Sequence, residues 1–169
     1  MTIPGVAPGD GEEFLARANG QIWSQSWHSP PTPPAGTPHG SLGICVTAQG
    51  DVVLVSEDGE RWDLPAGRPE GNETWEQTLR REMIEEACAT VVHARLLGFA
   101  RGECVEGPER GLVLVRSFWR ADVELAPWKP DFEIAHRRLV TPAELVSLLL
   151  AGNPFAPTLR RGLVEAGVL

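Results

Sequence analysis

The segment 74–87 constrains the fold most, because it carries the signals of a helix that must pack on a flat surface. Thr74 and Gln77 have the spacing of a capping box, in which each side chain bonds to the backbone N–H of the other residue. Behind this start, one apolar residue recurs every four positions: Trp75, Leu79, Met83 and Ala87. Such a stripe lies along one face of an α-helix, so this segment is predicted to cover a sheet.

Strand-like segments lie on both sides of this helix. Before it, residues 41–67 form a pattern of short strands separated by the turns AQGD and EDGE. After it come three segments rich in valine, leucine and aromatic residues: 90–104, 111–125 and 133–140. Two more helices are predicted, over residues 141–152 with Thr141 as N-cap, and over 156–169. The order strands, helix, strands, helix predicts an α/β (α+β) fold in which helices cover a sheet.

Residues 1–40 differ from the rest of the chain in composition. A short helix is predicted over about residues 10–18, and two tryptophans follow it. Five prolines within residues 30–38 then rule out regular structure in that stretch. We therefore interpret residues 1–40 as an N-terminal arm and proline-rich linker that lies on the domain or on a partner subunit. A single domain is predicted over residues 41–169.

The charge balance narrows the class of partners. The chain of 169 residues has a net charge of −8 at pH 7, which disfavours a broad nucleic-acid-binding surface. No apolar run is long enough to span a membrane and no signal peptide is evident, so a cytoplasmic protein is predicted. The three cysteines form no C-x-x-C pair, which indicates neither a zinc site nor a disulfide framework. The excess of acids is consistent with simple solubility and with a divalent-cation site, and local placement must decide.

Glu82, Glu85 and Glu86 are the acids whose placement is unusual. Their spacing of i, i+3 and i+4 puts them on one face of the predicted helix, where like charges repel by roughly a few tenths of a kcal/mol per pair. They also lie toward the C-terminal end of that helix, where the dipole disfavours negative charge. A cation such as Mg²⁺ would reverse the repulsion, because it prefers hard oxygen ligands. The ordinary alternative is a solvated acidic face paired with Arg80 and Arg81.

The wider stretch of residues 67–89 resembles the signature of the Nudix hydrolase family, Gly-x5-Glu-x7-Arg-Glu-U-x-Glu-Glu-x-Gly-U, where U is a bulky aliphatic residue. Seven positions match: Gly67, Glu73, Arg81, Glu82, Met83, Glu85 and Glu86. With its flanks, the resemblance runs from about residue 41 to residue 150. Cys88 and Ala89 depart from it, since the family has glycine and a bulkier aliphatic residue there. A helix-ending glycine often has positive φ, which costs another residue roughly 1 kcal/mol, so the turn at Cys88 is predicted either to differ or to tolerate this cost.

The resemblance implies a fold, an activity and a set of site residues. Family members have an α/β/α sandwich around a mixed β-sheet, and they hydrolyse nucleoside diphosphates linked to another group, assisted by Mg²⁺ or Mn²⁺. The metal ligands implied by the resemblance are Glu82, Glu85, Glu86 and the backbone carbonyl near Ala66. Gly67, Glu73 and Arg81 would have structural roles, with Glu73 and Arg81 as an ion pair that fixes the loop against the helix.

Residues outside this metal site complete the expected machinery. Charge that develops on phosphate oxygens needs fixed positive partners, and the candidates are Arg68, Arg101 and Arg116. The candidates for a general base are Glu82, Glu85 and, outside the signature, Glu133. Trp62 is a candidate for stacking on a nucleobase. A role without function in catalysis or binding stays open for each of these residues. Each arginine could be an ordinary surface residue, Glu133 a solvated loop acid and Trp62 a core aromatic.

Two functions from different classes are consistent with these residues. The first is a Mg²⁺-dependent hydrolase that cleaves a diphosphate bond in a nucleoside diphosphate linked to another moiety. The alternative is a Nudix-like module that binds a nucleotide or nucleotide sugar without turnover. Retention of all four signature glutamates favours the enzyme, and an acidic protein-interaction domain would not need their spacing. The substrate stays open among ADP-ribose, dinucleoside polyphosphates, (d)NTPs, coenzyme A and capped RNA, the last of which the acidic charge disfavours. A homodimer is one option for assembly.

Overall fold

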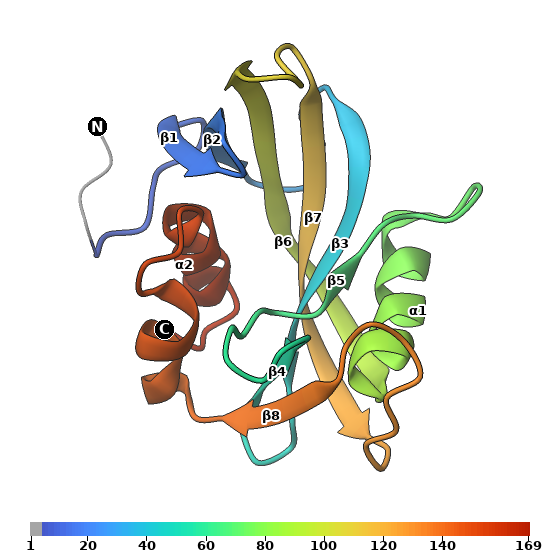
Figure 1. Cartoon of the computed structure of the whole chain (residues 1–169). Helices are drawn as coiled ribbons and strands as arrows, with labels where there is room; N and C mark the ends of the chain where they lie inside the picture. Colours follow the sequence, from blue (N-terminus) through green and yellow to red (C-terminus); the bar gives the residue numbers. More distant parts are fainter. Residues whose placement is uncertain (1–4) are drawn as a thin grey trace.

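A computed structural model describes residues 5–169 and has a mixed β-sheet with helices on both faces (Figure 1). Within these residues the sheet has eight strands, in the order β1-β2-β6-β7-β3-β4-β8, and β5 pairs separately with β3. Strands β3 and β7 are parallel, while the other pairs are antiparallel. The strands are β1 (Phe14–Ala18), β2 (Gln21–His28), β3 (Thr37–Val46), β4 (Val52–Ser56), β5 (Ala66–Gly67), β6 (Ala89–Glu106), β7 (Val113–Leu125) and β8 (His136–Val140). The α-helices are α1 (Trp75–Ala87) and α2 (Ala156–Glu165).

The two faces of the sheet carry separate hydrophobic clusters. On one face, α1 contributes the buried side chains of Leu79 and Met83. On the other face, α2 contributes Leu159 and Leu163 to a cluster that includes Phe118 of β7. Figure 1 shows the two helices on opposite sides of the sheet. The predicted α/β/α sandwich around a mixed sheet is therefore confirmed.

Helix α1 begins with the predicted capping box. The Thr74 hydroxyl accepts a hydrogen bond from the Gln77 N–H at 3.1 Å, and the Gln77 side chain accepts one from the Thr74 N–H at 2.8 Å. Gly43 of β3 then allows the helix to lie close to the sheet, because a methyl group there would come within 2.5 Å of Met83 Sδ. Close packing of α1 on β3 brings its acidic residues beside the loop that follows β4.

The N-terminal segment differs from the predicted arm. Strand β1 replaces the helix expected over residues 10–18, because this short segment pairs along its whole length with β2. Strand β2 pairs in turn with β6, and Trp27 is fully buried in the core. Tertiary pairing thus overrides the helical propensity of five residues. Residues 14–28 belong to the same sheet as the body of the chain, and residues 1–4 of the predicted arm lie outside the described residues.

Contacts with α2 hold the start of this segment in place. Arg161 of α2 pairs with Asp10 at 2.9 Å and donates to the carbonyl of Pro8 at 2.7 Å. Its guanidinium group also lies over the Trp27 ring, 5.7 Å from the ring centre. Strand β3 then starts at Thr37 and includes Pro38, in contrast to the irregular stretch expected there. A proline is tolerated because this end of β3 pairs with β7 on one side alone, so its missing N–H leaves no ladder bond unmade.

The segment before α2 does not form the α-helix that was predicted over residues 141–152. A 3₁₀ turn (Pro142–Glu144) is followed by a π-helical turn (Val146–Leu150). The wider turn closes with a hydrogen bond from Ala151 N–H to the Val146 carbonyl at 2.9 Å, and it lets two consecutive leucines face the core. No helix in residues 5–169 has the length and apolar character needed to cross a membrane.

Candidate functional site

A chain of buried side-chain hydrogen bonds fixes the start of α1 to the sheet. The Trp119 indole N–H donates to Ser117, the Ser117 hydroxyl donates to Ser41, and the Ser41 hydroxyl donates to the backbone carbonyl of Trp75. The three distances are 2.8, 2.8 and 2.6 Å. Both serines are fully buried, so each bond satisfies a polar group that would otherwise be costly to bury. The chain connects β7 and β3 to the first turn of α1 and thereby positions the acids farther along that helix.

Arg81 connects the acids of the helix to the loop before it. Its guanidinium group binds the Glu73 carboxylate through two hydrogen bonds of 2.8 and 2.9 Å, the bidentate geometry of a strong pair. It also donates to Glu82 at 2.7 Å, to Glu85 at 3.1 Å and to the carbonyl of Arg68 at 2.8 Å. Hydrogen bonds from Arg81 are the main reason that the pKa of Glu73 is lowered to about 2. The Glu73–Arg81 pair expected from the sequence is thus present in the structure.

Gly67 of β5 leaves the room that Glu82 needs. The Glu82 carboxyl group lies directly against the Gly67 backbone, so that a side chain at residue 67 would occupy the same space. Burial raises the pKa of Glu82, and Arg81 opposes this rise. A glycine at this position therefore brings a half-buried carboxylate next to the backbone of Ala66–Gly67.

Glu86 lies on the other side of the same loop. Its carboxylate accepts a hydrogen bond from the Ala66 N–H at 3.0 Å. Burial is the main cause that raises its pKa to about 7; nearby Glu82 and Asp63 add to this, while Arg116 opposes it. A carboxylate removed from water in this way is stabilised by a cation, because the cation favours its charged form.

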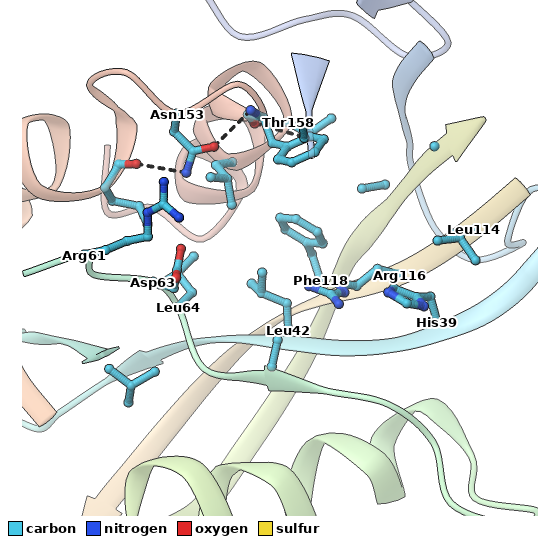
Figure 2. A pocket seen from close by; sticks show the side chains of 18 of the residues that line it. His39, Leu42, Arg61, Asp63, Leu64, Leu114, Arg116, Phe118, Asn153 and Thr158 are labelled. Carbon is cyan, nitrogen blue, oxygen red and sulfur yellow. Dashed lines mark hydrogen bonds between the residues drawn. The ribbon is translucent and has the colours of Figure 1, made fainter. Parts of the chain in front are cut away.

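A cavity of about 650 Å³ lies on the α2 side of the sheet and is lined by both Ala66 and Glu86. Strand β3 pairs with β5 at Leu42 and with β4 only at Val46, so the sheet is open between β4 and β5. Through this opening a residue of α1 lines a cavity on the opposite face. Figure 2 shows Arg116 beside His39 on one wall of the cavity.

Arg116 is the arginine that the structure brings to Glu86. It lies on β7 and lines the cavity, and the charge of Glu86 acts directly on it. Its Nε is buried and has no hydrogen-bond partner within residues 5–169. Burial lowers the pKa of this guanidinium group. A buried donor without an acceptor costs about 1–3 kcal/mol, and an anion in the cavity would supply the acceptor.

A second cavity, of about 500 Å³, gathers the acidic residues. It is lined by Glu82, Glu85, Glu86, Phe132, Glu133 and Ile134. Glu133, which comes from the loop before β8, therefore lies near Glu82, Glu85 and Glu86, and its role as a general base stays a prediction. Glu86 and Ile134 line both cavities and connect them.

Three residues considered from the sequence line neither of these two cavities. Arg101 pairs with Glu103 at 3.0 Å and alternates with two cavity-lining residues of β6, so it points to the α1 side of the sheet. Trp62 lies under the Arg138 guanidinium group, 5.8 Å from the ring centre. Arg68 contributes its backbone carbonyl to Arg81. Their roles in substrate binding stay predictions without support from the cavity linings.

The donor set of this region fits a divalent cation. Glutamate carboxylates and a backbone carbonyl are hard oxygen ligands of the kind that Mg²⁺ prefers. Within residues 5–169, no three such side chains converge on a single point. Instead Arg81 holds Glu82 and Glu85, while Glu86 bonds to the Ala66 N–H. A cation bound by Glu82, Glu85 and Glu86 would compete with Arg81 for the carboxylates of Glu82 and Glu85.

His39 was not expected near the site, because the sequence placed the start of the domain after it. It lines the cavity beside Arg116, and its pKa is lowered to about 4 by burial and by the charges of Arg116 and Arg68, with Glu109 opposing. The side chain is therefore neutral at pH 7. Alternation along β7 puts Arg116 on the same face as Phe118, but only the pairing of the strands decides that this face lines the cavity.

His39→Gln should make stability in EDTA less sensitive to acid. The His39 pKa is about 4 in the folded protein against about 6.5 when unfolded, so below pH 6.5 the unfolded state binds the extra proton. The wild-type protein therefore loses stability as the pH falls from 6.5 to 4, and the variant lacks this contribution. The measurement is the difference in Tm between the two proteins at each pH, in which the effects of other titrating groups cancel. A difference that does not change between pH 7 and pH 4 would contradict this expectation.

The end of α1 settles the question raised by Cys88. Cys88 adopts the left-handed conformation, with φ 50° and ψ 43°, and its N–H donates to the Ile84 carbonyl at 3.1 Å. Its own carbonyl accepts from the Ala126 N–H at 2.8 Å. Arg137 donates to the carbonyl of Ala87 at 2.8 Å and so neutralises the helix end. The glycine-type turn is thus retained, and a residue with a side chain is tolerated in it.

Cys88→Gly should raise the free energy of unfolding by about 0.5–1 kcal/mol, because glycine adopts this conformation without strain but is more flexible when unfolded. For a chain of this size the corresponding rise in Tm is about 2 °C. Cys88→Ala is the matched control, since it removes the thiol and keeps the strained Cβ. Thermal melts that rank Gly no higher than Ala would show that the turn is unstrained.

Residues 37–162 match the NUDIX domain family, and no curated protein matches the chain. A mutant of the Bacillus subtilis pyrophosphohydrolase BsRppH is 20% identical, covers 92% of this chain and 96% of its own, and has a TM-score of 0.72. A NUDIX hydrolase from Nitrosomonas europaea is 19% identical, with coverages of 78% and 89% and a TM-score of 0.61. The MutT protein from Methanosarcina mazei Go1 is 20% identical, with coverages of 78% and 97% and a TM-score of 0.58.

Proposed function

This chain belongs to the Nudix family, and from this premise we propose that it is a Mg²⁺-dependent hydrolase that cleaves a diphosphate bond in a nucleoside diphosphate derivative. Mn²⁺ is an alternative cation. The residues proposed to hold the cation are Glu82, Glu85, Glu86 and the carbonyl of Ala66. The observation that carries the proposal is the position of Glu86, whose carboxylate lines both the acidic cavity and the larger cavity that contains Arg116.

The positions of these residues suggest a separate role for the cation, for Arg116 and for the carboxylates of the acidic cavity. When bound, Mg²⁺ neutralises diphosphate charge and lowers the pKa of water. Arg116 stabilises the negative charge of a phosphate oxygen in the larger cavity, and its unpaired Nε–H donates a hydrogen bond to that oxygen. The acidic cavity provides carboxylates that can take the proton of the attacking water: Glu82, Glu85 or Glu133. Arg81 keeps the first two of these in place through its hydrogen bonds and is itself held by Glu73.

The test is turnover by the purified full chain with Mg²⁺. ADP-ribose, a dinucleoside polyphosphate, (d)NTPs, coenzyme A and a capped RNA are each incubated with the protein, and the released phosphate compounds are identified by chromatography. We expect hydrolysis of at least one compound, loss of activity in EDTA and recovery when Mg²⁺ is restored. Tight binding of a nucleotide without hydrolysis of any compound would contradict the enzyme and support a binding module.

Gly67→Ala should remove most of the response to Mg²⁺ while the fold stays intact. The added methyl group displaces the end of the flexible Glu82 side chain from its place beside the loop, without disturbing any buried apolar group. We expect the rise in Tm on adding Mg²⁺, which measures binding to the native state, to shrink or disappear. The Tm in EDTA serves as the control and should change little. A variant with the full Mg²⁺ response would show that Glu82 does not need this position.

The cytoplasmic location and the homodimer stay proposals of the same kind. Fractionation of cells that express the tagged chain tests the first. Sedimentation of the purified protein over a range of concentrations tests the second.

A further inference from the structure

The N-terminal hairpin of β1 and β2 forms one end of the larger cavity. It contributes four lining residues, Ala18, Asn19, Trp23 and Gln25, all of which precede the segment 37–162 that matches the family. The same lining includes Arg116 and Glu86. One continuous cavity therefore connects the proposed reaction centre with a hairpin that the signature does not include.

Trp23 and Gln25 lie side by side over Gly102 of β6. A methyl group at Gly102 would collide with the Gln25 amide nitrogen and would lie 3.6 Å from Cε3 of Trp23. Alternation along β2 puts both side chains on the cavity face, as it does for Trp27 in the core. The side chains of Trp23 and Gln25 are both partly exposed and line the cavity. An aromatic face and an amide group that can donate and accept hydrogen bonds thus lie side by side in the cavity lining.

The sheet register gives the distance from this end to Arg116. Gln25 is opposite Gly102, and Arg116 is opposite Ala100, so the two residues lie two strands apart and one row apart. With about 4.8 Å between strands and about 6.7 Å per two residues, their Cα atoms are on the order of 12 Å apart. An extended nucleoside diphosphate spans a comparable distance between its base and its outer phosphate.

We propose that Trp23 and Gln25 form the subsite for the base of a nucleoside diphosphate whose phosphates lie at Arg116 and Glu86. The inference rests on the proposed function, since it places the reacting phosphates at that site. Trp23 stacks on the planar base, and the Gln25 amide hydrogen-bonds its edge. Stacking is tolerant of sequence, because every base has a π-face, so Gln25 carries the choice among bases.

The binding test uses uncleavable probes with Mg²⁺ and calorimetry. The probes are the α,β-methylene diphosphates of adenosine, guanosine, cytidine and uridine, together with methylenediphosphonate, which has the phosphates without a base. We expect at least one nucleoside probe to bind the wild-type chain about tenfold or more tightly than methylenediphosphonate. Trp23→Ala should weaken that nucleoside probe by about 5- to 150-fold and leave methylenediphosphonate unchanged.

Two further variants separate base recognition from stability of the hairpin. Gln25→Ala should reduce the spread of affinities among the four nucleoside probes, and Gly102→Ala should have a similar effect by displacing the Gln25 amide without removing any contact of the hairpin. Ser24→Ala is the matched control, because Ser24 lies between the two residues and does not line the cavity. Its affinities should equal those of the wild-type chain.

The subsite is overturned if no nucleoside probe binds better than methylenediphosphonate, or if the Trp23 and Gln25 variants lose nothing, or if they lose equally for both kinds of probe. A chain that hydrolyses a substrate and behaves in one of these ways contradicts the subsite alone. A chain that shows the expected binding pattern but hydrolyses nothing contradicts the proposed hydrolase and leaves the subsite standing.

Discussion

Glu86→Gln is expected to lower kcat by about two to four orders of magnitude, because a lost metal ligand removes several kcal/mol of transition-state stabilisation. The amide keeps the shape of the side chain, and its oxygen can still accept the hydrogen bond from the Ala66 N–H. The fold should therefore persist. Since burial already opposes the charged form of Glu86, the variant in EDTA should be as stable as the wild-type chain or more stable.

The control for this variant lies on the same helix. Glu76→Gln removes an exposed carboxylate that pairs with Arg80 and lines neither of the two cavities. It should leave kcat and the Mg²⁺ response of Tm at wild-type values. If Glu86→Gln keeps full activity and the full Mg²⁺ response, the assignment of Glu86 to the cation is wrong.

Arg116→Met should lower kcat/KM by about two to three orders of magnitude, the usual result of removing one fixed donor that faces developing oxyanion charge. Methionine has a similar length and fills the space without a charge. Because the guanidinium group is buried and its Nε has no partner within residues 5–169, its removal should not lower Tm. Large loss of activity without loss of stability is what distinguishes a phosphate-binding arginine from a structural one.

Arg95→Met is the comparison for this variant. Arg95 also lies on a central strand of the sheet, but its side chain is exposed and donates to the carbonyl of Glu165 outside the cavity. We expect activity close to that of the wild-type chain. Equal activities of the Arg95 and Arg116 variants would remove Arg116 from the proposed site.

The helix and the loop before it could be predicted from the sequence, because their interactions are local. The capping box joins residues three apart, the apolar stripe repeats every four, and the Glu73–Arg81 pair spans eight. Each therefore leaves a pattern within a short window. The two helices on opposite faces follow from the order of elements in the same way.

The hairpin and the choice among arginines could not be predicted, because both depend on long-range register. The five residues of β1 have no strand pattern strong enough to override their helical propensity until β2 lies beside them. Arg101 and Arg116 both lie on strands with alternating burial, and only the pairing of those strands decides which one faces the cavity. The prediction of irregular structure at Pro38 was wrong for a related reason. Pro38 lies where β3 pairs with β7 on one side alone, and this depends on the arrangement of the whole sheet.

The pairing of β2 with β6 also has a consequence for the order in which the molecule folds. The side chain of Gln21 bonds to Glu109, 88 residues farther along the chain, and Trp27 is buried only when β6 and β7 are in place. During synthesis the first strands therefore leave the ribosome well before their partners exist, and a large aromatic side chain stays in water meanwhile. Contacts of such long range slow folding and expose the intermediate to aggregation. The N-terminal hairpin is thus made before the rest of the sheet, yet it can dock only after β6 has been made.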